Sequence, residues 1–229
     1  MRIVPLLTTC AIVLTASLLA RPCAAQAVEG HDCGSIENAY GPYDYTNAAE
    51  RVAKLKIVED HHFDAGVEQL QGHLTKPGGA AMLGGDIDYT LRASPNHHRA
   101  LWAMVRYNLE KTPLTVPKMR YTPECYFDRA MRFKPDDGVV RMLYGMYLHK
   151  INHNDMALQR YSEALSLAPD SAEVHYNLGL LLVDMQRFDD AVVHARRAYE
   201  LGYPLLGLQH KLERAGHWPG DTVAAQPPS

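Results

Sequence analysis

One stretch of the chain repeats itself at a fixed interval, and this repeat constrains the fold more than any other feature. Between Gly138 and Pro204, several positions recur after 34 residues. The recurring pairs are Tyr144-Gly145 with Leu178-Gly179, Ala157 with Ala191, Tyr161 with Ala195, and Ala164 with Ala198. A period of this length is typical of helical hairpins that stack and bury their apolar faces against one another. The sequence therefore predicts an all-α fold.

Small residues in the repeat mark the points where the two helices of a hairpin would touch. Gly145 and Gly179 lie in the first helix of each unit, and Ala157 and Ala191 lie in the second. A bulky side chain there would push the helices apart, because protein interiors are close-packed. We therefore expect Gly145, Gly179 and Ala191 to be inaccessible contact points.

The period and the order of large and small residues, with Pro169 closing the first unit, resemble the tetratricopeptide repeat (TPR) of exported bacterial proteins. The resemblance covers roughly residues 86–215. It implies a superhelix of helical hairpins, about three repeats with a capping helix, preceded by an irregular N-terminal segment. Ala195 stands where the family usually carries an aromatic residue, and Tyr203-Pro204 displaces the terminal proline by one position. These departures are typical of a repeat near the end of an array.

The chain divides around the repeats. We expect a signal peptide at 1–27, an irregular and partly helical segment at 28–85, a TPR-like domain with its capping helix at 86–216, and a disordered tail at 217–229. The glycine-rich run Gly72–Gly85 predicts a flexible loop. Leu205, Leu208 and Leu212 have the spacing of the capping helix, which would cover the open end of the stack.

Several polar residues are placed to cap helices. Asn47 precedes an amphipathic run, and Thr122 precedes a proline at the first helical position. Asp137 and Asp170 are predicted to cap the two clear repeats, and Asp170 with Glu173 has the spacing of a capping box.

The N-terminus has the features of a secretory signal. A basic start at Arg2 is followed by an apolar run, and Ala25-Gln26-Ala27 forms a small-x-small cleavage site. Cleavage after Ala27 would place the chain in the periplasm or outside the cell, without stable membrane insertion. An uncleaved membrane anchor is the alternative, and the hydroxyl residues within the run make it the weaker one.

Signal cleavage would leave one pair of cysteines. Cys10 and Cys23 would be lost, so Cys33 and Cys125 remain. In an oxidising compartment these two are expected to join, and two free buried thiols are the alternative. Cleavage also removes two arginines from the 23 basic residues, which leaves 21 against 26 acidic residues. Nothing in this balance indicates a nucleic-acid partner.

The resemblance implies a concave face, lined by the first helix of each unit, that holds an extended peptide or a partner helix. The family's groove positions correspond here to Met142, Met146, His149, Lys150, Glu173, Tyr176, Asn177 and Leu180. Asn177 stands where some family members hold a peptide, but the lysine and arginine partners of that clamp are not matched. The alternative is core packing, with the N-terminal segment filling the groove.

Metal binding and catalysis have weaker support. Adjacent histidines on a helix point about 100° apart, so neither His61-His62 nor His97-His98 chelates well alone. His149 and His153 are better spaced, but no cysteine or carboxylate completes a ligand set. The sequence has no nucleophile elbow, zinc-protease motif or phosphate-binding loop. We therefore expect no metal, no cofactor and no enzyme activity.

These observations predict an exported protein that binds another protein or a peptide in the cell envelope, as a scaffold or assembly factor. The alternative is a periplasmic protein that binds a small ligand, a glycan or a metal through its Tyr-, Asp- and His-rich N-terminal half.

Overall fold

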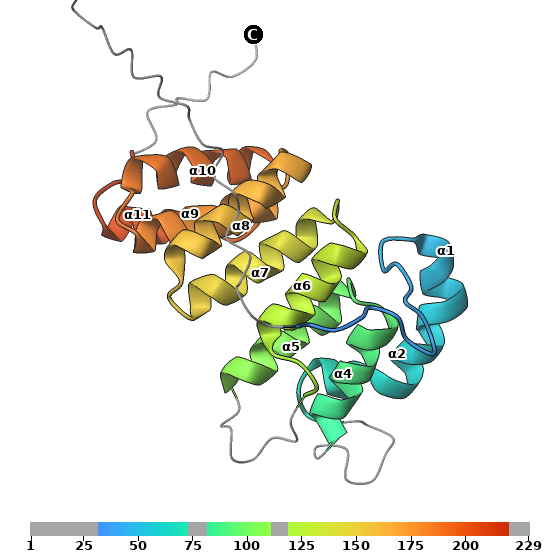
Figure 1. The fold of residues 1–229 in the computed structure, drawn as a ribbon. Helices are drawn as coiled ribbons and strands as arrows, with labels where there is room; N and C mark the ends of the chain where they lie inside the picture. The colour runs from blue at the N-terminus through green and yellow to red at the C-terminus, as the bar shows by residue number, and fades with distance from the viewer. Residues whose placement is uncertain (1–31, 73–81, 111–118, 220–229) are drawn as a thin grey trace, which may run out of the picture. The chain divides into compact units, whose positions relative to one another are not determined.

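The computed structural model describes residues 32–72, 82–110 and 119–219, and the regular elements within these ranges are helices (Figure 1). They are α1 (Ala48–Glu50), the π-helix η1 (Arg51–Leu55), α2 (Lys56–His62), α3 (Ala65–Glu68), α4 (Leu83–Ala93), α5 (His98–Glu110), α6 (Pro123–Phe133), α7 (Gly138–Lys150), α8 (Asn154–Leu167), α9 (Ala172–Asp184), α10 (Phe188–Glu200) and α11 (Gly207–Arg214). The predicted signal peptide lies outside the described residues. None of the helices described here has the length and apolar character needed to span a membrane.

Stacked hairpins form the second half of the chain. Helix α7 packs on α8 and α9 packs on α10, while the first helices of successive units contact each other, α5 with α7 and α7 with α9 (Figure 1). Asn152 and Gln186, which are 34 residues apart, both have a positive φ, at 62° and 59°. Both hairpins therefore turn at the same position, and the predicted all-α stack of hairpins is confirmed.

The small residues lie at tight contacts, as predicted. A Cβ atom on Gly145 would lie 2.9 Å from Cε1 of Tyr161, and Ala191 is fully buried. In the next unit Ala195 replaces the tyrosine, and a Cβ on Gly179 would instead overlap the Leu208 side chain of α11. Leu208 therefore takes the place against Gly179 that the Tyr161 ring takes against Gly145. The departure at Ala195 makes room for the capping helix.

The helix N-caps predicted from the sequence are observed, except at α9. Asp137 Oδ1 accepts hydrogen bonds from the backbone amides of the first turn of α7, and Asn47 and Thr122 cap as expected. The prediction for Asp170 is wrong, because Ser171 caps α9. Ser171 follows Asp137 by the 34-residue period, so the repeat itself places the cap there. Asp170 lies outside the helix, where its carboxylate pairs with Arg197 at 2.6 Å.

Two further expectations need correction. The glycine-rich run predicts a loop up to Gly85, but α4 begins at Leu83, so the last two glycines of the run are helical. Residues 73–81 of this run lie outside the described ranges. Leucine spacing predicts that Leu205 belongs to the capping helix, but it precedes α11 and is 57% exposed, whereas Leu208 and Leu212 are fully buried.

The N-terminal segment is held by a disulfide and by arginines of α6. Cys33 joins Cys125, with their Cα atoms 5.1 Å apart, as predicted. Arg129 of α6 is buried and donates hydrogen bonds to the carbonyl oxygens of Cys33 and Ser35. Arg132 donates to the carbonyl oxygen of Gly34 at 2.9 Å. The segment is thus fastened to α6 through its main chain.

The same segment then passes the end of α4. The Tyr43 amide donates to the carbonyl oxygen of Ala93 at 2.9 Å, and the Tyr45 amide donates to Asn96 Oδ1 at 3.0 Å. Gly41 has φ of +102°, and any Cβ there would overlap the main chain at Ala93, so only glycine fits. The described part of the segment therefore lies on α4 and α6.

A histidine pair inside the α9–α10 hairpin couples stability to pH. The Nδ1 atoms of His175 and His194 lie 2.9 Å apart. His175 Nε2 donates to the carbonyl oxygen of Pro169 at 3.0 Å, so the Nδ1 of neutral His175 accepts from His194. Burial, and to a lesser extent the neighbouring His175 and Arg187, lower the pKa of His194 against the opposing effect of Asp190.

We expect acid to destabilise this hairpin through His194. The folded protein binds this proton less tightly than the unfolded chain, so the stabilisation is complete above the ordinary histidine pKa of about 6.5 and falls below it. His194→Asn keeps a donor for His175 without titrating. Its free energy of unfolding should therefore fall less than that of the wild type between neutral pH and about pH 5. Denaturant unfolding measures this, with exposed His210→Asn as the control, and equal losses in all three proteins would contradict it.

Candidate partner-binding groove

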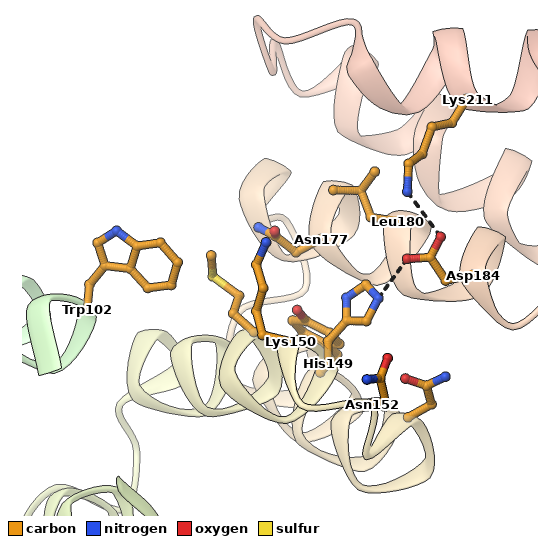
Figure 2. Close-up of a pocket in the computed structure, with 11 residues that line it drawn as sticks. Trp102, His149, Lys150, Asn152, Asn177, Leu180, Asp184 and Lys211 are labelled. Atoms are coloured by element: carbon orange, nitrogen blue, oxygen red, sulfur yellow. Dashed lines mark hydrogen bonds and ion pairs between the residues drawn. The ribbon is translucent and has the colours of Figure 1, made fainter. Parts of the chain in front are cut away.

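A cavity of about 570 Å³ opens between the first helices of successive hairpins (Figure 2). Its lining residues come from α5, α7, α8, α9, α11 and the turn between α7 and α8. They are Trp102, Met146, His149, Lys150, Asn152, Asn154, Tyr161, Asn177, Leu180, Asp184 and Lys211. The volume is within the usual range of ligand-binding pockets.

Apolar side chains form part of the wall. Trp102 of α5, Met146 of α7 and Leu180 of α9 are each partly buried against the core and still line the cavity. In Figure 2 the Trp102 ring lies on one side of the cavity, and Leu180 lies across it. Three successive units therefore contribute apolar surface to one site.

One carboxylate on the wall is shared by two basic side chains. Asp184 Oδ2 lies 2.9 Å from His149 Nε2, and Asp184 Oδ1 accepts from Lys211 Nζ at 3.0 Å (Figure 2). Burial opposes ionisation of this carboxyl group, but the hydrogen bonds from Lys211 and His149 outweigh it and lower the pKa of Asp184. The carboxylate is thus ionised, and both of its oxygens are already paired with side chains of the protein.

The Lys150 and Tyr161 side chains also line the cavity, and their polar ends are not hydrogen-bonded to any described residue. Within the described ranges, neither the Lys150 ammonium nor the Tyr161 hydroxyl has a hydrogen-bond or ion-pair partner. Tyr161 is fully buried yet reaches the cavity from α8, and burial raises its pKa, so the hydroxyl keeps its proton. Asn154 Oδ1 is also without a partner, but it is shielded from solvent.

Comparison with known proteins agrees with this geometry. A family model described as "TPR repeat" matches residues 148–186, which run from the end of α7 through α8 and α9. This stretch is therefore similar to a tetratricopeptide repeat. A solved structure of a MamA mutant is 18% identical to this chain, covers 67% of this chain and 94% of that chain, and has a TM-score of 0.39. None of the curated proteins compared matches the chain.

The structure brings together most of the TPR groove residues expected from the sequence. Met146, His149, Lys150, Asn177 and Leu180 all line the cavity. Their role in binding stays a prediction.

Three other expected residues do not line the cavity. Met142 is only 2% exposed and Tyr176 only 8%, so both belong to the core, and their assignment as contact residues is corrected. The Tyr176 ring stacks on Tyr203 with centroids 4.2 Å apart, a contact from beyond the repeat that its spacing does not reveal. Glu173 is exposed but is not part of the cavity lining.

The sequence did not reveal several residues of the cavity lining. Trp102 precedes the regular repeats, and an insertion after α5 breaks the 34-residue register that would have aligned it. The repeat pattern indicates only helix packing for Tyr161, although its hydroxyl end reaches the cavity. Lys211 lies on the capping helix, outside any repeat. Its link to the site is the ion pair with Asp184, which becomes visible only in the folded structure.

Two histidines of the N-terminal half, His97 and His98, have structural partners. His97 Nε2 lies 3.0 Å from Glu59 Oε1, and its Nδ1 accepts from the Ala100 amide, so both ring nitrogens are used. His98 Nε2 donates to Asp137 Oδ2 at 2.8 Å. Within the described residues no group of three His, Cys, Asp or Glu side chains is arranged to hold a metal ion.

Proposed function

We propose that this TPR protein binds another protein or a peptide in its groove and acts as a scaffold or assembly factor. The observation that carries the proposal is the cavity between α5, α7 and α9, because three successive units supply its apolar wall. TPR domains typically serve as protein-interaction scaffolds. The described part of the N-terminal segment lies on α4 and α6, so it does not occupy this cavity.

We further propose that the protein works after export, in the cell envelope. Two observations support this location. The first 27 residues have the pattern of a cleaved signal peptide. The Cys33–Cys125 disulfide is of a kind that persists in oxidising compartments.

The role of the groove in partner binding can be tested by placing negative charge on its apolar wall. Met146→Glu combined with Leu180→Glu should reduce capture of a crosslinked partner from envelope fractions at least tenfold, since losing a central contact often costs about 2 kcal/mol or more. The melting temperature should change little, because both side chains are only partly buried. The intact mass of this protein, isolated from the same envelope fractions, reports whether its mature chain begins at Val28.

A matched control places the same charge elsewhere on the hairpins. Val193 of α10 is 65% exposed and lies outside the groove cavity, so Val193→Glu should leave capture unchanged. If the Met146/Leu180 variant still captures the same partner at wild-type yield, the groove is not the binding surface.

A further inference from the structure

Two side chains of the groove, Lys150 and Tyr161, each present a hydrogen-bond donor without a partner in the described part of the chain. The Lys150 ammonium, at the last turn of α7, makes no ion pair or hydrogen bond to any residue that the structure describes. The Tyr161 hydroxyl, which reaches the cavity from α8, is likewise unbonded there and stays protonated because burial raises its pKa. A ligand group that fits both must accept hydrogen bonds.

The charges of the lining favour an anion. The cavity contains two lysines, Lys150 and Lys211, and one carboxylate, Asp184. Lys211 compensates Asp184 at 3.0 Å, which leaves the charge of Lys150 unbalanced. The whole chain has a net charge of −3, so this local positive charge is opposite in sign to the protein as a whole. Charge complementarity of this kind selects partners by attraction and by repulsion.

We propose that the groove takes an acidic side chain of an extended partner peptide, with the carboxylate accepting from Lys150 and Tyr161. An apolar residue next to it in the peptide packs on Trp102, Met146 and Leu180. This inference rests on the proposed function and adds the chemistry of the partner. Because the lining runs from α5 to α11, the peptide continues on both sides of Lys150, so the carboxylate comes from a side chain and not from a chain end.

A random peptide library with amidated C-termini tests the proposal, using the full chain with its disulfide intact as bait. Peptides whose binding is lost in an uncharged Met146→Ala/Leu180→Ala variant define groove binders. These should share an Asp or Glu at a fixed distance from an apolar residue. Lys150→Met should weaken their binding about tenfold or more, as expected for loss of a hydrogen bond to a charged group. Tyr161→Phe, which keeps the ring against Gly145, should weaken it several-fold.

Two further variants sharpen the experiment. Lys54→Met removes an exposed lysine of η1 that is not part of the cavity lining, and it should leave binding unchanged. Lys150→Glu should reverse the preference, so that the selected peptides carry Lys or Arg in place of the acid. Added salt should weaken the wild-type interaction more than that of Lys150→Met.

The outcomes separate this inference from the proposed function. Groove binders without an acidic preference, or with full affinity for Lys150→Met, would overturn the inference and leave the groove function standing. The same holds if the amidated library shows no acidic preference and a second library with free C-terminal carboxylates does. If no peptide depends on Met146 and Leu180, the peptide-binding function and the inference are both wrong.

Discussion

Replacing Cys33 and Cys125 together by alanine should lower the free energy of unfolding by about 2–5 kcal/mol. The bond closes a loop with a sequence separation of 92 residues, and without it the unfolded chain gains the conformations that the loop excludes. Denaturant unfolding of the two proteins measures the difference.

Removal of the disulfide should also lower local stability more in some parts of the chain than in others. Without the disulfide, the segment near Cys33 is still held by Arg129 and Arg132, but these are hydrogen bonds to its main chain that open individually. The hairpins of α7 to α10 contact one another without the disulfide. Amide exchange should therefore accelerate at residues 34–45 more than in α7 or α9. Equal acceleration throughout would show that the segment and the repeats unfold as one unit.

Gly179→Leu should destabilise the protein by about 1–3 kcal/mol or more, because it overfills a closed contact. The new side chain would occupy the space of Leu208, which is fully buried, and would displace α11 from α9. The displaced helix exposes Leu212 as well. Thermal unfolding reports the loss, and proteolysis should cut first around α11.

A glycine in open space provides the matched control. Gly85 lies in α4, and a Cβ there would meet nothing within 4 Å. Gly85→Leu should leave stability unchanged or raise it by up to about 1 kcal/mol, because leucine favours helix more than glycine does. If Gly179→Leu melts like the wild type while Gly85→Leu behaves as expected, the contact between Gly179 and Leu208 is not formed in solution.

The sequence determined the local features of the repeats. A 34-residue period fixes which residues share a face in every unit, so the hairpins and the buried positions Gly145, Gly179 and Ala191 were predicted correctly. The disulfide was predicted because Cys33 and Cys125 are the pair that the expected signal cleavage would leave. The cap of α9 was misplaced because a local capping-box pattern at Asp170 was preferred to the period, which identifies Ser171.

The tertiary structure decided which positions of the groove face are open. Met142 and Met146 both lie on the face that periodicity assigns to the groove, yet Met142 is buried and Met146 lines the cavity. Tyr176 is covered by Tyr203, while Trp102 and Lys211 enter the site from outside the regular repeats. Helical spacing is a local property, set by 3.6 residues per turn, and so can be read from one segment. Exposure depends on side chains from other segments, whose positions follow from loop lengths and from the volumes packed between helices.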